Sequence, residues 1–186
     1  MLTVMGALAL LSLLMLTINS MIVTQTTSNL ESEATLNAIS LAQSLIDEVM
    51  TKAYDDSMYI PNPPYSKTSP KRIWDTTGFT PASAMHPSAT EAAQVPQPDH
   101  LMTNASYHSE LYYSAIGDYS GYVREVITPV MGTFRLTVTV NYADESHPDQ
   151  NTPTRSYFKK ITVNVTHLNM SHPFSLTDVA VYRRFF

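Results

Sequence analysis

The chain has 186 residues, of which 44% are hydrophobic and only 15% charged, with a formal net charge of −5 and no cysteine. The acidic balance argues against a nucleic-acid partner, and the missing cysteines exclude disulfides, zinc–thiolate sites and iron–sulfur sites. This length predicts one domain in addition to the segment formed by the unusually apolar first residues.

The first thirty residues contain no Asp, Glu, Lys, Arg or His. About 20 apolar residues at 1.5 Å each cross the hydrocarbon core of a bilayer, and residues 1–23 reach that length. We therefore predict a membrane-length apolar helix at the start of the chain.

The same helix is predicted to continue well beyond the apolar segment, because no proline precedes Pro61 and the helical pattern lasts to about Tyr54. Apolar residues recur there at intervals of three or four, which places them on one face. They are Leu30, Ala34, Ala38, Leu41, Leu45 and Val49. We predict a long helix over 1–54, made of an apolar assembly or membrane segment (1–29) and an amphipathic segment (30–54) that lies on a folded domain.

Three interpretations of the N-terminus compete. A secretory signal peptide needs a basic n-region, yet the first basic residue is Lys52. A signal anchor prefers flanking Lys or Arg on its cytoplasmic side, and none is present. We favour the third interpretation, in which a basic leader has been removed. A plain membrane anchor stays an alternative, because leucine-rich spans do not report their neighbours.

Within the predicted helix, residues 17–29 are rich in β-branched, hydroxyl and amide side chains, which are poorer helix formers than the leucines before them. We expect this stretch to be locally unwound in an assembled state, where Thr, Ser and Asn side chains take up freed backbone groups. The alternative is an intact helix whose hydroxyls bond back to its own carbonyls.

Residues 55–117 have a different composition and are predicted to form a long, mostly irregular connection. Eight of the twelve prolines lie here: Pro61, Pro63, Pro64, Pro70, Pro81, Pro87, Pro96 and Pro98. Aromatic residues in the same region favour an ordered segment that packs on the domain or on a neighbouring subunit. They are Tyr59, Tyr65, Trp74, Phe79, Tyr107, Tyr112 and Tyr113.

Residues 118–186 carry the strand signals. Residues 133–142 and 156–167 alternate apolar and polar side chains, as half-buried strands do, and a polar connection separates them. Residues 121–130 and 176–186 are predicted to be two further strands of an antiparallel meander. The predicted fold class is α+β, with the long N-terminal helix packed against an antiparallel sheet of about four strands.

This order of elements resembles the type IV pilins and pseudopilins. The residues that carry the resemblance lie within 1–56, from an apolar helix opening on Met1 to SLAQSLIDEVMTKAYDD, which is similar to a pilin helix leaving its filament core. Most bacterial members have a Glu at the fifth mature position that is taken to pair with a neighbour's N-terminal amine, whereas this chain has Met5. Members without that Glu occur among minor pseudopilins and archaeal pilins.

The resemblance implies removal of a leader, storage in the cytoplasmic membrane, and extraction by assembly machinery into an extracellular helical filament made of copies of the chain. We expect the assembly contacts to involve Met1, Met5, Leu8, Leu11, Met15, Ile18 and Ile22. Two alternative functions stay open. One is a minor pseudopilin of a secretion or pilus machine, and the other is a membrane-anchored ligand-binding module that uses the loop aromatics in a concave site.

Catalytic chemistry is not indicated, and no catalytic, cofactor or metal site is predicted. The five glycines form no phosphate loop, and the six histidines lack metal-ligand spacing. His108 and Glu110 could form a pair of the kind used in hydrolysis, but they would lie side by side only on a strand. Asp75, Asp99 and Asp118 are the residues that we considered as oxygen ligands for Ca²⁺, without EF-hand spacing.

Three sequons match the N-glycosylation pattern and begin at Asn104, Asn164 and Asn169. Asn164 is expected on the polar face of its strand. We retain all three as possible glycosylation sites, which a glycosylating host would have to modify.

Overall fold

The computed structural model describes residues 2–59 and 75–182, with residues 2–5, 7–9 and 59 described as backbone only. Tyr65 and Trp74, which were expected to pack against the domain, lie outside the described residues.

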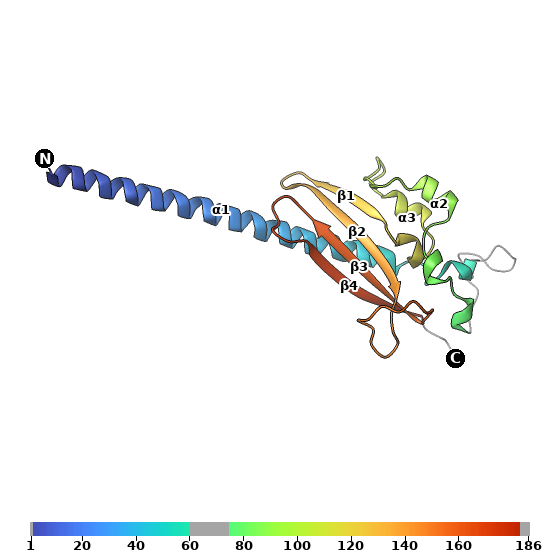
Figure 1. The fold of residues 1–186 in the computed structure, drawn as a ribbon. Helices are drawn as coiled ribbons and strands as arrows, with labels where there is room; N and C mark the ends of the chain where they lie inside the picture. Colours follow the sequence, from blue (N-terminus) through green and yellow to red (C-terminus); the bar gives the residue numbers. More distant parts are fainter. Residues whose placement is uncertain (1, 60–74, 183–186) are drawn as a thin grey trace.

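The described elements are a long helix, a set of short helices and four strands. They are α1 (Leu2–Met50), η1 (Asp56–Tyr59), η2 (Thr76–Gly78), η3 (Ala82–Ala84), α2 (Ala89–Gln94), α3 (His108–Tyr112), η4 (Ile116–Tyr119), β1 (Val123–Thr128), β2 (Gly132–Tyr142), β3 (Phe158–Thr166) and β4 (Phe174–Val181). Figure 1 shows α1 as a rod whose second half lies along the sheet, with the short helices gathered near its end.

Helix α1 has 49 residues and ends at Met50, four residues before the predicted end. The chain leaves the helix because Ala53 pairs with Ala115 in an isolated parallel bridge. The Ala53 N–H donates to the Ser114 carbonyl at 3.1 Å, and the Ile116 N–H donates to the Ala53 carbonyl at 2.9 Å. A distant segment thus decides where the helix stops.

The strands form one sheet in the order β1-β2-β3-β4, with every neighbouring pair antiparallel, which confirms the predicted meander. The first strand is shorter than predicted and ends at Thr128, because Pro129 has no N–H for the ladder and a turn follows it. Gly132, with φ of +87°, begins β2. Strand β4 begins at Phe174, earlier than predicted, and residues 183–186 lie outside the described residues.

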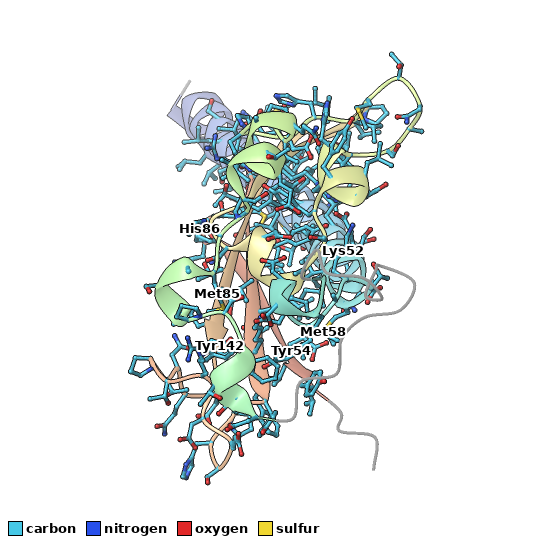
Figure 2. The ribbon with its side chains drawn as sticks, turned by 90° about the vertical axis from the view of Figure 1, so that its right-hand side faces the viewer. Lys52, Tyr54, Met58, Met85, His86 and Tyr142 are labelled. Carbon is cyan, nitrogen blue, oxygen red and sulfur yellow. The ribbon has the colours of Figure 1, made fainter. Side chains whose placement is uncertain are left out.

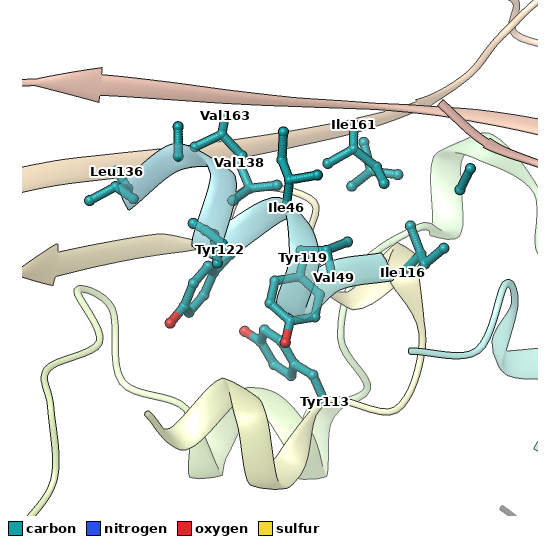
Figure 3. Close-up of a cluster of buried hydrophobic side chains, with 14 of the residues drawn as sticks. Ile46, Val49, Tyr113, Ile116, Tyr119, Tyr122, Leu136, Val138, Ile161 and Val163 are labelled. Carbon is teal, nitrogen blue, oxygen red and sulfur yellow. The ribbon is translucent and has the colours of Figure 1, made fainter. Parts of the chain in front are cut away.

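The core lies between the second half of α1 and the sheet. The Ile46 side chain projects from the helix toward Val138 and Val163 of the central strands, and Val49 lies beside Tyr119 in the same cluster (Figure 3). The alternation predicted for β2 is confirmed by its buried residues Phe134, Leu136, Val138, Val140 and Tyr142. The predicted helical stripe is confirmed at Ala34, Ala38, Leu45 and Val49, and the stripe also contains Ala42 and Ile46. Leu30 is wrong as a core residue, because it lies beyond the end of the sheet and is 39% exposed.

The region between helix and sheet contributes aromatic side chains to the core. Tyr113, Tyr119 and Tyr122 meet edge to face with ring centroids 5.0–5.6 Å apart, below α1 in Figure 3. Phe79 is buried in a second aromatic cluster with Tyr54. Of the aromatic residues predicted to pack, Phe79 and Tyr113 are buried, whereas 38% of Tyr112 is exposed.

Candidate assembly surface

The first half of α1 projects beyond the domain as a bare apolar rod (Figure 1). Its large side chains from residue 10 to residue 23 are 50–70% exposed: Leu10, Leu11, Leu13, Leu14, Met15, Leu16, Ile18, Met21, Ile22 and Val23. Apolar surface costs about 25 cal/mol per Å² when it faces water. The rod is therefore stable only when lipid or other protein covers it.

Four of the predicted assembly residues line one shallow groove along the rod. Leu11, Met15, Ile18 and Ile22 follow one another at intervals of three or four, and the groove also touches Ser12, Leu16 and Asn19. Met5 and Leu8 lie on the same helix, where only the backbone is described, and Met1 is outside the described residues.

Hydroxyl side chains of the rod bond to the helix itself. Thr17 Oγ1 donates to the Leu14 carbonyl at 2.8 Å, and Thr24 Oγ1 donates to the Ser20 carbonyl at 2.9 Å. The hydroxyls of Ser20, Thr26 and Thr27 likewise donate to backbone carbonyls three or four residues earlier in the helix. In the single chain, residues 17–29 are thus an intact helix with back-bonded hydroxyls, and the unwinding expected in an assembled state stays a prediction.

Within the described part of the chain, one helix is long and apolar enough to cross a membrane. Its apolar window is entirely unburied and lies near the N-terminus. These properties are compatible with a membrane anchor or a signal segment, and thus with association of the chain with a membrane.

A buried ion pair fixes the second half of α1 to the sheet. Arg124 on β1 donates to Glu48 on α1 at 2.6 Å, and the two side chains are only 5% and 11% exposed. Tyr119 Oη and Ser109 Oγ donate to the other Glu48 oxygen at 2.6 and 2.8 Å. Burial, followed by the Glu48 charge, raises the pKa of Tyr119, so this phenol stays protonated as a donor.

The Arg124 guanidinium also contacts the segment that covers it. Its carbon lies 3.8 Å above the Tyr107 ring centre, and its Nε donates to Tyr122 Oη at 3.0 Å. Tyr122 in turn donates to Asp99 at 2.7 Å. The network therefore joins α1, β1 and the connection before α3.

A second buried ion pair lies just after the C-terminal end of α1. Lys159 Nζ is 2.9 Å from Asp55 Oδ2 and donates to the Tyr54 carbonyl at 2.6 Å. Figure 2 shows Tyr54 and Tyr142 close together at this end, and the Lys159 ammonium lies 4.6 and 5.4 Å from their ring centres. Burial opposes ionisation of Asp55, but the Lys159 charge and the hydrogen bonds to Asp55 outweigh it and lower the pKa of this carboxyl.

Lys52 anchors the end of α1 to α3. Its Nζ donates to the carbonyls of Glu110 and Tyr113 at 2.8 and 3.0 Å. These carbonyls lie at the C-terminal end of α3, where a cation is favoured. The C-terminal end of α1 is therefore held in place on the domain by polar contacts from Glu48 to Asp55.

Three carboxylates converge on the Ser114 hydroxyl. Its Oγ lies 2.8 Å from Glu91, 3.4 Å from Asp56 and 3.5 Å from Asp118. Asp118 Oδ2 accepts the N–H groups of Ser114 and Ala115 at 3.0 and 2.8 Å, whereas its Oδ1 is buried without a hydrogen-bond partner. Burial and the nearby Asp56 raise the pKa of Asp118 to about 7.

The aspartates considered as Ca²⁺ ligands are not brought to one place. Asp75 caps η2 at the surface, Asp99 is buried against Tyr122, and Asp118 faces Asp56. Among the described residues, no group of three or more His, Asp and Glu side chains has a geometry that could hold a metal ion.

His108 and Glu110, which would share one face only on a strand, lie instead on the short helix α3. The Asp99 carboxylate accounts for the helix: it binds the backbone N–H of His108 and of Ser109 at 3.4 and 3.1 Å, at the helix start. It also contacts His108 Nδ1 at 2.7 Å.

The three sequons lie on different parts of the domain. Asn104 and Asn169 are exposed in connections, and Asn164 is half-buried on the outer face of β3, opposite Thr137 and Ser175. Asn169 belongs to the β3–β4 connection, which contacts α1.

The sequence interpretation missed the buried charges, although one signal pointed to Lys159. It shares the parity of Ile161, Val163 and Val165 on β3, so it had to face inward. The partner Asp55 is 104 residues away, and that distance in sequence hides the pair.

The fold and the surface together define a class: an α+β protein with a projecting apolar rod on a four-stranded antiparallel meander. No protein-family model, curated protein or solved structure matches the chain.

Proposed function

We propose that this chain is a structural subunit of an extracellular filament of the type IV pilus kind, which polymerises through the first half of α1. Before assembly it resides in the cytoplasmic membrane, from which assembly machinery extracts it. The observation that carries the proposal is the projecting rod, whose side chains are 50–70% exposed from residue 10 to residue 23.

The rigid continuity of the rod with the domain supports this function. Residues 2–50 form one helix, and the buried Glu48–Arg124 pair fixes the helix to the sheet. Because the second half of α1 is fixed to the sheet, the chain leaves the domain at one place and in one direction, so packing of the rods sets a defined relation between the domains. A regular filament needs that relation.

The polar composition of residues 24–29 also favours protein neighbours. This uncharged stretch, TQTTSN, lies between the apolar residues and the first charge at Glu31. Hydroxyl and amide side chains can bond between helices that approach closely.

The buried aromatics support a structural role over a ligand-binding one. Phe79, Tyr113 and Tyr119 fill the interior of the subunit, each with 2% or less of its surface exposed. A concave aromatic binding site needs several aromatic side chains that face solvent together, whereas Tyr112 is the one exposed aromatic among the described loop side chains, at 38%. The alternative function, a minor pseudopilin, has the same architecture. It would be present in far fewer copies per filament than a major subunit.

The yield of filaments from matched variants tests the proposal. Ile18→Ala removes side-chain atoms that line the groove but keeps the rod apolar. We therefore expect membrane insertion to persist and packing between rods to be lost. Leu13→Ala, outside the groove, is the control with the same loss of side-chain atoms. We expect fewer sheared filaments from the Ile18 variant than from the control. Equal, wild-type yields from both, or no filaments from the unmodified chain, would contradict the proposal.

A further inference from the structure

Two connections of the sheet lie at the end from which the rod emerges. Strand pairing places residues 129–131, between β1 and β2, at the same end as residues 167–173, between β3 and β4. Both point along the rod in Figure 1. His167 Nε2 lies 2.8 Å from the Met131 carbonyl and so joins the two connections.

The β3–β4 connection rests on α1. Glu31 accepts hydrogen bonds from the Ser171 N–H, at 3.2 Å, and from the Ser171 hydroxyl. Leu168 and Met170 share a small pocket with Thr27 and Leu30 of the helix. These contacts fix how far along the rod the domain reaches.

Exposed apolar side chains stand at this end of the domain. Ile127, Val130 and Leu168 are 74%, 81% and 98% exposed, and we call these three residues the apolar rim. Exposed residues of this size are isolated on most domains, whereas here three lie at one end of one sheet.

The two ends of the sheet differ in charge. Residues 129–131 and 167–173 contain no Asp, Glu, Lys or Arg. The connection at the opposite end, residues 143–157, contains Asp144, Glu145, Asp149 and Arg155. Charged side chains are costly in lipid, so this asymmetry fits a domain with its uncharged end against a bilayer.

The position along the rod matches the lipid headgroup layer. Thr27, which borders the same pocket as Leu168, lies four residues beyond Val23, or about 6 Å at the helical rise. The interfacial layer on each side of a bilayer is about 5–7 Å thick. With residues up to Val23 in the hydrocarbon core, the near edge of this contact, at Thr27, is at the level of the headgroups, and its far edge, at Glu31, lies about 12 Å beyond Val23 on the aqueous side.

We propose that the apolar rim is a membrane-contact surface, which enters the interfacial layer of a lipid bilayer while α1 spans it. This inference rests on the membrane-resident stage of the proposed function. Lipid fits better than a second protein copy, because the rim side chains protrude separately, Ile127 from β1 and Val130 and Leu168 from the two connections, and a fluid surface accommodates them. The contact sets the depth and tilt of the subunit before extraction.

Site-directed fluorescence in lipid tests the contact, and the absence of cysteine from the chain removes any background. Full-length Val130→Cys and Leu168→Cys variants carry an environment-sensitive dye in phosphatidylcholine nanodiscs that hold one copy each. Leu14→Cys reports insertion of the rod, and Asn151→Cys reports the opposite end of the sheet. Lipids that carry a quencher either just below the headgroups or deep in the chains are compared.

We expect the shallow quencher to reduce the dye signal at residues 130 and 168, the deep quencher to reduce it at 14, and neither to reduce it at 151. Quenching at 14 without quenching at 130 and 168 would overturn the rim contact and leave membrane residence intact. No quenching at 14 would instead refute membrane residence and the contact with it. If the dyes at residues 130 and 168 are shielded from water only in vesicles that hold many copies of the chain, the rim contacts a second copy, and this result would also overturn the proposal.

Discussion

Buried ionisable side chains hold the rod to the domain, and each has a specific partner. The Lys159–Asp55 pair is almost completely buried, and Arg124 meets Glu48 in a site closed by Tyr119 and Ser109. Taking charges out of water costs several kcal/mol per ion, which only good geometry offsets. The rod's orientation therefore depends on contacts that tolerate little change.

Replacing Arg124 should destabilise the fold strongly. An Arg124→Met variant leaves the buried Glu48 carboxylate without its cation, so we expect a loss of about 3–5 kcal/mol in the free energy of unfolding. Chemical denaturation of the full chain in detergent measures the loss. The double variant Glu48→Leu with Arg124→Met should recover much of it, because no unpaired charge remains. A loss below about 1 kcal/mol in the single variant would show that the pair does not hold the rod.

Asp118 makes stability depend on pH near neutrality. The pKa of Asp118 in the folded state, about 7, lies above the ordinary value of 3.8. Its contribution to the free energy of unfolding is therefore fully present below pH 3.8 and is lost as the pH rises through 7. Asp118→Asn keeps the acceptor for the Ser114 and Ala115 N–H groups and cannot ionise. The variant should gain stability over the wild type as the pH is raised from about 5 to about 8. Thermal unfolding at both pH values checks this, and a constant difference would be the contrary result.

At the scale of elements, the alanine stripe of α1 determines how closely the sheet approaches. Ala34, Ala38 and Ala42 have no exposed surface, and the helix packs there against β3 and β4. Ala38→Leu should overpack this contact and cost about 1–3 kcal/mol, while Ser40→Leu, on the exposed side, should change stability little. Denaturation of both variants measures the difference. Equal stabilities would mean that the helix and sheet do not pack as closely as described.

The rod's middle section is the element expected to change on assembly. Residues 17–29 are helical in the single chain, held by hydroxyl bonds such as that from Thr24 to Ser20. We predict that these residues unwind in filaments, where the same side chains take up freed backbone groups. Backbone amides of residues 17–29 should then exchange with solvent deuterium faster in filaments than in detergent-held monomer, relative to residues 30–50. Equal protection in the two states would refute the unwinding.

Local pattern predicted the elements well. Alternation identified β2 and the inward face of β3, and three-to-four spacing identified most of the stripe on α1, because these periodicities are properties of the chain itself. The helix end and the buried charges were not predictable in this way. Ala53 leaves the helix to pair with Ala115, and Glu48 meets an arginine 76 residues later, so both depend on contacts between distant segments. In the candidate assembly surface, four of the expected assembly residues line the groove, whereas the short helices and the acidic cluster around Ser114 carried no sequence signal that we recognised.

At the scale of the whole molecule, one stiff element serves two environments. The second half of α1 is part of the domain core, and the first half is bare apolar surface. Within the proposed function, the rod first meets lipid and then other rods, while the polar connection at residues 143–157 faces away from both. The outer face of the sheet, with Asn164, and the connection that contains Asn104 are then available on the outside of the filament.

An electron cryomicroscopy map of fibres sheared from the producing cells tests the central claim most directly. The proposal predicts that the map contains this chain, with residues 10–23 of each copy packed against the same residues of its neighbours along the fibre axis. Fibres that lack the chain, together with purified full-length protein that is monomeric in detergent with a rod that contacts only lipid or detergent, would contradict it.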